Sequence, residues 1–260
     1  MGDSKNTGET LDMLFDGKLE VYQSRGGYRF SLDAILLAYF ATLRDGDKVA
    51  DLGTGNGVIP LILAYLHPAL SITGVEIQEA MVDRAKRNVN LNRLATRVSA
   101  VHADISSIAQ KFGPESFTAV VCNPPYRRAN SGRISPNAEK KVARHEIRGA
   151  LEDFLKAGAY LLPIKGRIAV VYPAVRAIDL LMAMRKAGVE PKRLRAVHSY
   201  AAAEASLVLV EGVKGGKSEV KVHAPLVVYQ EEKRYTAEVE AMLSGKPPTA
   251  RGNELKDGAR

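Results

Sequence analysis

The sequence predicts a doubly wound α/β fold, in which helices cover both faces of one mostly parallel sheet. Short apolar runs rich in β-branched residues alternate with stretches of helical periodicity along most of the 260 residues. A glycine-rich turn follows an early apolar run, and polar side chains end the next three. Sheets of this class bind their ligands at the carboxyl ends of the strands, so these side chains are candidates for a site.

Seven apolar runs are predicted strands. The last two have only residues 200–204 between them, which is too short for a helical crossover, so the final strand is expected to be antiparallel. The predicted strands are Lys48–Leu52, Ser71–Ile77, Val98–Ala103, Phe117–Cys122, Gly166–Tyr172, Leu194–Ser199 and Ala205–Glu211.

Apolar residues spaced at i, i+3 and i+4 predict the helices that pack on this sheet. We expect each stripe to be the buried face of its helix. The stripes are Leu32, Ile35, Leu36, Tyr39, Phe40 and Leu43; Val82, Ala85 and Val89; Leu151, Phe154, Leu155, Leu161 and Leu162; and Val175, Ile178, Leu181 and Met182.

The polar ends of the chain frame one predicted domain, residues 11–243. Residues 1–10 and 244–260 contain Pro or Gly among polar residues, and we expect both to be mobile. Within an N-terminal extension, residues 11–47, the alternating stretch 17–30 includes a Gly-Gly pair. This pattern is typical of a small hairpin, expected here to lean on the main sheet.

Composition narrows the function classes. The net charge of +8 and pI of about 9.5 favour a polyanionic partner. The first residues lack a signal pattern and no run is long enough to span a membrane, so we expect a cytoplasmic protein without membrane association. The single cysteine, Cys122, excludes a disulfide framework or a cysteine-based zinc cluster, and we expect it in the core with no metal bound.

The loop "DLGTGNG" ends the first predicted strand with Asp51, Gly53, Gly55 and Gly57. Its spacing is neither G-x-G-x-x-G nor a P-loop, so taken alone it could be a tight turn without a ligand. The later strands favour a nucleotide-like ligand. Glu76 stands at the end of the second strand, where an acid accepts hydrogen bonds from ribose hydroxyls.

Asp104 ends the third predicted strand. Its carboxylate can accept from an adenine amino group, cap the helix expected from about Ser106, or do both.

The order of these motifs over residues 48–126 resembles that of the class I S-adenosylmethionine-dependent methyltransferases, which have a Rossmann-like sheet. The resemblance implies that the glycine loop receives the methionine part of the cofactor. It further implies that Glu76 binds the ribose, Ile77 packs on the adenine and Asp104 holds the adenine amine. The cofactor-binding set it implies is Asp51, Gly53, Thr54, Gly55, Asn56, Gly57, Glu76, Ile77, Asp104, Ile105 and Asn123.

The fourth strand ends in "NPPY", Asn123 to Tyr126. An amine on an adenine ring or an amide is a poor nucleophile because its lone pair is delocalised. Two acceptors, the Asn123 side-chain oxygen and the Pro124 carbonyl, can hold its two N–H groups and localise that pair. Pro124 and Pro125 fix the direction of the carbonyl, and Tyr126 can stack on the planar group. This positioning needs no general base before transfer. A simple proline-rich turn is the alternative.

The segment 127–148 carries much of the chain's positive charge, with seven Lys or Arg against two Glu. A basic lid beside a base-accepting pocket suits RNA, although a solvated charged helix would show the same composition. The candidate RNA-binding residues are Arg127, Arg128, Arg133, Lys140, Lys141, Arg144 and Arg148.

Several stretches, among them residues 17–38, "ARHE" (143–146) and "PLVVY" (225–229), resemble the family that methylates adenine N6 in a valine tRNA. The resemblance spans residues 11–243 and implies a tRNA substrate. Ser31 and Asp33 belong to the same match; their residue types predict a helix cap, whereas the resemblance implies that the segment closes over the cofactor. Ribosomal RNA, DNA adenine and a protein glutamine are alternative substrates, because each presents an amine whose lone pair is delocalised. A non-catalytic RNA-binding protein of the same fold is an alternative of another class. The sequence leaves the oligomeric state open.

Overall fold

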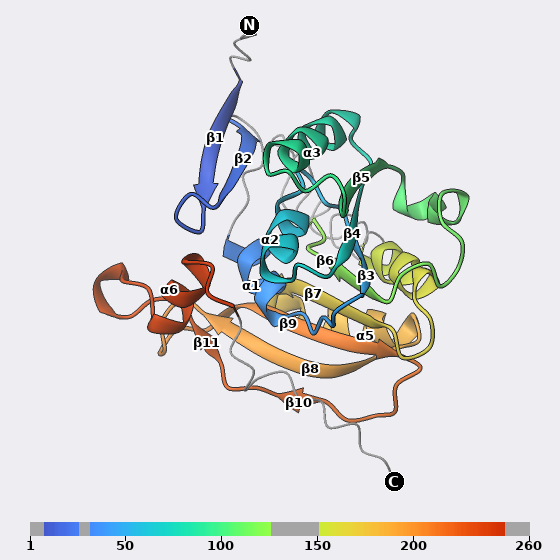
Figure 1. The fold of residues 1–260 in the computed structure, drawn as a ribbon. Coiled ribbons are helices and arrows are strands. Elements are labelled where there is room, and N and C mark those ends of the chain that lie inside the picture. The colour runs from blue at the N-terminus through green and yellow to red at the C-terminus, as the bar shows by residue number, and fades with distance from the viewer. Residues whose placement is uncertain (1–7, 26–31, 126–150, 248–260) are drawn as a thin grey trace, which may run out of the picture.

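A computed structural model describes residues 8–25, 32–125 and 151–247 of the chain (Figure 1). Its centre is a sheet in the strand order β5-β4-β3-β6-β7-β9-β8-β10, with the short β11 also paired to β8. Strand β9 runs antiparallel to both β7 and β8, and every other pairing in this sheet is parallel. The predicted doubly wound fold is therefore confirmed.

The seven predicted strands all form, and two short strands extend the sheet beyond β8. Strand β8 begins earlier than predicted because its ladder with β9 extends to Val189, past a register shift between Pro191 and Arg193. The bounds are β3 Lys48–Leu52, β4 Ser71–Glu76, β5 Val98–His102, β6 Ala119–Cys122, β7 Arg167–Pro173, β8 Val189–His198, β9 Ala205–Lys214, β10 Lys221–Val222 and β11 Leu226–Val227.

Two apolar cores lie on opposite faces of the sheet, as the alternation of side chains along each strand requires. Val49 of β3 belongs to one core and its neighbour Ala50 to the other. The first core packs against α1 (Leu32–Phe40), α2 (Val58–Leu66), α3 (Glu79–Leu91) and α6 (Ala237–Leu243). The second packs against the helical residues 151–161, α5 (Ala177–Lys186) and the 3₁₀ turn η1 (Ile105–Gln110). Two further 3₁₀ turns are η2 (Ala174–Arg176) and η3 (Glu231–Lys233).

The stripe predicted for the helix after β7 was wrong at three of its four positions, since only Leu181 packs on the second core. Val175, Ile178 and Met182 are exposed, and α5 instead buries Leu180, Ala183 and Met184. Its sequence, AIDLLMAMRK, is apolar on most sides, so periodicity alone does not select the buried face.

The predicted hairpin exists, but its place in the sequence was wrong. Strands β1 (Glu9–Leu14) and β2 (Leu19–Ser24) pair antiparallel around a turn at residues 15–18, and the Gly-Gly pair lies outside the described residues. The hairpin lies beside α3 rather than on the main sheet (Figure 1).

Some residues of the two chain ends that were predicted to be mobile, 1–10 and 244–260, are part of the folded structure. Glu9 begins β1, and the buried Gly245 with Lys246 continues from α6, where the Tyr39 hydroxyl donates to the Lys246 carbonyl at 2.8 Å.

Cys122 lies in the core as predicted, and its burial raises the pKa of the thiol above the ordinary value. In the described part of the chain no helix is long and apolar enough to cross a membrane.

Candidate active site at the carboxyl edge of the sheet

The glycine-rich loop between β3 and α2 is fastened to β4 through its backbone. The N–H groups of Gly53 and Thr54 both donate to the carbonyl of Val75, at 2.8 and 3.0 Å. Gly57 precedes α2 in a left-handed conformation (φ 83°), and a Cβ on it would lie 3.1 Å from the Ala85 Cβ of α3. Only glycine adopts this backbone without strain in so tight a space.

Glu76, at the end of β4, is buried and holds this loop. One carboxylate oxygen accepts from the Gly55 N–H at 3.0 Å, and the other accepts from the Gln78 N–H at 2.9 Å. The orientation of the carboxylate is therefore fixed by two backbone donors. Because each oxygen has two lone pairs, both can still accept a further hydrogen bond, such as one from a ribose hydroxyl.

Asp51, at the end of β3, is completely buried, and neither of its carboxylate oxygens has a hydrogen-bond partner among the residues that the structure describes. Burial raises the pKa of Asp51 to about 7; the neighbouring Thr54 hydroxyl opposes this shift, and the charge of Glu76 adds to it. The Thr54 hydroxyl is also buried, and it forms no hydrogen bond with Asp51 or with any other described residue. Nearly all buried polar groups in proteins form hydrogen bonds. Polar atoms that lack one, gathered at the end of one strand, therefore indicate a place for a polar ligand.

Ile77 and Asp104 follow β4 and β5 at the same edge. Ile77 exposes 57% of its surface, which leaves it available to pack on a flat ring, and its carbonyl contacts the His102 imidazole at 2.8 Å. Asp104 accepts from the Ser106 N–H at 2.8 Å and so caps η1, which confirms the predicted cap. Ile105 is the first residue of that turn.

The start of the NPPY motif lies next to the glycine loop. Leu52 of β3 pairs with Cys122 of β6, so Gly53 and Asn123 leave the sheet from neighbouring positions. Asn123 is half-buried, Pro124 is buried and Pro125 is exposed. The register therefore brings together the loop, the acids and this motif at one edge of the sheet.

Part of the predicted site lies outside the described residues. This holds for Tyr126, for the cap residue Ser31 and for the whole basic segment with Arg127, Arg128, Arg133, Lys140, Lys141, Arg144 and Arg148.

Two asparagines that the sequence did not point to, the buried Asn88 and the half-buried Asn92, fix the hairpin to α3. The Asn92 amide exchanges hydrogen bonds with the Glu20 backbone (3.0 and 2.7 Å), and the Asn88 amide does the same with Tyr22 (2.7 and 3.1 Å). Asn88 also donates to the carbonyl of Asn56 in the glycine loop at 2.9 Å. The asparagines of "NVNLN", four apart on one helix face, were the available signal.

Asn88 contacts the glycine loop and Asn92 does not, so their alanine variants form a matched pair. Asn88→Ala and Asn92→Ala should both lower the melting temperature, because each releases part of the hairpin. Only Asn88→Ala should also weaken cofactor binding, by about 2- to 13-fold, which corresponds to one net hydrogen bond of about 0.5–1.5 kcal/mol. Calorimetric titration with S-adenosylmethionine measures the affinities. Equal affinities in the two variants would show that the Asn56 contact does not order the loop.

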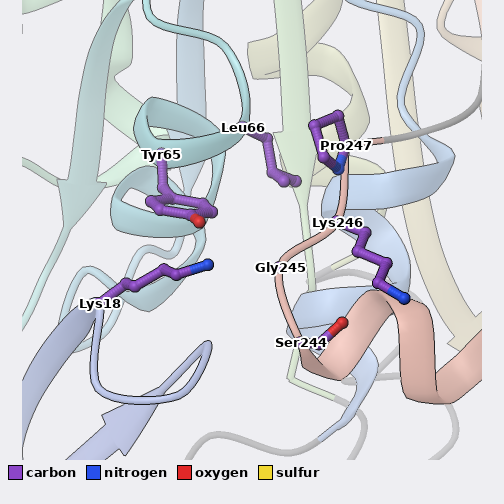
Figure 2. A pocket seen from close by; sticks show the side chains of 7 residues that line it. All are labelled: Lys18, Tyr65, Leu66, Ser244, Gly245, Lys246 and Pro247. Carbon is purple, nitrogen blue, oxygen red and sulfur yellow. The ribbon is translucent and has the colours of Figure 1, made fainter.

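A cavity of about 370 Å³ lies away from this site. It is lined by Lys18, Tyr65, Leu66 and residues 244–247, and the Lys18 ammonium lies 5.9 Å from the centre of the Tyr65 ring (Figure 2). Tyr65 and Leu66 end α2, whose first residues follow the glycine loop, so the cavity lies at the amino edge of the sheet.

The strand order with an antiparallel β9, together with the glycine loop and the polar strand ends, defines an S-adenosylmethionine-dependent methyltransferase of class I. The methyltransferase small domain family matches residues 32–173, and the chain belongs to that family.

Relatives and solved structures agree with this family. The tRNA1(Val) (adenine(37)-N6)-methyltransferase of Actinobacillus succinogenes is 30% identical over 85% of this chain and 91% of its own length. The protein of the same name from Dickeya chrysanthemi is 29% identical over 85% of this chain and 88% of its own. A predicted O-methyltransferase of Agrobacterium tumefaciens has a TM-score of 0.70 at 21% identity, covering 85% of this chain and 99% of that one. At 21% identity, the similarity to the Agrobacterium protein is evidence for the fold alone.

Proposed function

We propose that this enzyme transfers the methyl group of S-adenosylmethionine to N6 of adenine 37 in a valine tRNA. The observation that carries the proposal is the likeness to tRNA1(Val) (adenine(37)-N6)-methyltransferases over 85% of the chain. Asn123 and Pro124 at the end of β6, beside the glycine loop, supply the chemistry that an exocyclic amine needs. A tRNA substrate fits the net charge of +8, and we propose that the enzyme acts in the cytoplasm.

The residues present at the carboxyl edge fit the cofactor. S-Adenosylmethionine supplies a methyl group on a positively charged sulfonium and carries a cationic ammonium. The buried Asp51 carboxylate, which has no hydrogen-bond partner in the described part of the chain, is complementary to that positive charge. Glu76 would accept from the ribose, Ile77 would cover the adenine, and Asp104 would accept from the adenine amine.

Asn123 and Pro124 would act on the target amine. The Asn123 side-chain oxygen and the Pro124 carbonyl would each accept one N–H, which turns the nitrogen lone pair toward the methyl group. Pro124 is buried, so its carbonyl is held by the surrounding packing rather than by a free loop.

The experiment is methyl transfer to an unmodified valine tRNA transcript, with the products digested and located by mass spectrometry. We expect N6-methyladenosine at position 37. A transcript with guanine at position 37 is the control and should accept no methyl group. Methylation of ribosomal RNA, duplex DNA or a glutamine-containing peptide in place of the tRNA would overturn the proposed substrate while leaving the enzyme class intact.

A further inference from the structure

Three tyrosines beyond the carboxyl end of β8 form a stack that has no part in the site described above. The rings of Tyr200 and Tyr229 have centroids 5.6 Å apart, and those of Tyr229 and Tyr235 lie 5.1 Å apart and nearly parallel, at 25°. Tyr229 in the middle packs on the first apolar core, whereas Tyr200 and Tyr235 at the ends expose 38% and 36% of their surfaces. We call Tyr200, Tyr229 and Tyr235 the tyrosine stack.

The backbone holds this stack in place. The Tyr229 N–H donates to the Ser199 carbonyl at 2.9 Å, which ties the segment after β11 to the end of β8. Tyr229 and Tyr235 are bridged as an antiparallel pair, closed by the Gln230 N–H donating to the Arg234 carbonyl at 2.7 Å. Aromatic rings that are already ordered lose little entropy when a ligand stacks on them.

The stack lies at the same edge of the sheet as Asn123. Leu207 of β9 pairs with both Pro173 of β7 and Val197 of β8, so β7 and β8 end at one level. Strands β6 and β8 are separated by β7 and β9, which corresponds to three strand spacings or about 14 Å. A nucleic-acid strand that delivers a base to Asn123 can therefore reach the stack within a few nucleotides.

The charges around the stack favour a base over a phosphate. The turn beside it carries Glu231 and Glu232 against Lys233 and Arg234, all exposed, and Glu204 lies in the loop after Tyr200. This balance gives no net attraction for a polyanion, whereas every base has a flat face that can stack on an aromatic ring.

We propose that the tyrosine stack is a second RNA-binding subsite, on which an unpaired base flanking the target nucleotide stacks. The proposal rests on the proposed function and adds to it a binding site separate from the methyl-transfer centre. No covalent step is involved.

The test uses the fact that the chain contains no tryptophan. In Tyr200→Trp the introduced indole is the only one in the protein, so its emission reports on this position alone. Adding a valine tRNA transcript, or the single-stranded anticodon-loop oligonucleotide, should quench it strongly. The control Tyr160→Trp, in the helix before β7 and so toward the opposite edge, should not be quenched, and duplex RNA without unpaired bases should quench neither variant.

Affinity measurements separate stacking from simple packing. Tyr200→Leu keeps an apolar side chain but has no ring face, so it should bind the transcript about 5- to 100-fold more weakly, whereas Tyr200→Trp should bind normally. The slope of log affinity against log salt should stay unchanged in Tyr200→Leu, because no phosphate contact is lost.

Failure of this proposal is distinguishable from failure of the proposed function. If the parental enzyme methylates the tRNA but the Tyr200→Trp indole is not quenched, the second subsite is disproved and the function stands. Quenching by a proline-rich peptide and not by RNA would also overturn it. If the parental enzyme does not methylate the tRNA at all, the proposed function itself fails.

Discussion

Asn123→Ala should reduce the rate of methyl transfer at least about 100-fold, the scale seen when one preorganised hydrogen-bonding group is removed from a reacting centre. The variant loses the side-chain acceptor and keeps the Pro124 carbonyl and the glycine loop. The loss should appear mainly in kcat, because the contact matters most as the nitrogen becomes tetrahedral. Cofactor affinity should fall far less than the rate, because the glycine loop, Glu76 and Asp104 remain in place.

The measurement is single-turnover methyl transfer to unmodified tRNA, with cofactor affinity determined separately by calorimetry. Asn90→Ala is the matched control, since Asn90 is an exposed asparagine on α3. It should transfer at the parental rate. If Asn123→Ala also retained that rate, the two-acceptor mechanism would be wrong and the motif would serve only as a turn.

Asp51→Asn should stabilise the cofactor-free protein above neutral pH and at the same time weaken cofactor binding. In the folded protein the Asp51 pKa is raised to about 7 from 3.8, mainly by burial. This group therefore stabilises the fold below pH 3.8, and its contribution is lost as the pH rises to about 7. Each pKa unit corresponds to about 1.4 kcal/mol, so at pH 8 the buried charge costs on the order of 4 kcal/mol.

Asparagine at this position carries no charge, so the stability of the Asp51→Asn protein should not fall over that pH range through this group. It also cannot neutralise a cationic ligand, so affinity for S-adenosylmethionine should drop at least about 10-fold at pH 8, the loss of one charge-assisted hydrogen bond. For the parental enzyme the affinity should fall as the pH is lowered through about 7.

Denaturant unfolding at pH 5 and pH 8, with titration calorimetry at both, tests these expectations. Asp45→Asn, which removes an exposed acid, is the control for a general change of charge. A parental protein whose stability relative to Asp51→Asn did not decline from pH 5 to pH 8 would contradict the buried, unpaired carboxylate.

The strand ends show why so much of the candidate site could be predicted. In a parallel sheet the carboxyl ends of all strands meet at one edge. Once the strands were located by their apolar runs, Asp51, Glu76 and Asn123 had to lie close together, and the register of Leu52 with Cys122 confirms the placement of the last of these. The burial of Cys122 and the cap by Asp104 followed from equally local patterns.

Other features depended on contacts between residues far apart in the sequence. The buried face of α5 was mispredicted because that helix is apolar on most sides, so only the shape of the sheet beneath it selects Leu180 and Met184 over Ile178 and Met182. Asn88 acquires its three hydrogen bonds only when a hairpin 66 residues earlier in the chain and the glycine loop come together around it.

The sequence by itself determined the fold class, the edge of the sheet that carries the site and the acids and amide that stand there, because these follow from periodicity and strand order. The tertiary structure alone decided three further features. Among the described residues Asp51 is buried without a hydrogen-bond partner, and Asn88 of α3 joins the hairpin to the glycine loop. Tyr200 stacks with Tyr229 and Tyr235, about 30 residues later in the chain. Burial, partners and ring contacts depend on which distant residues fill the space around a side chain, and short-range patterns carry no information about that.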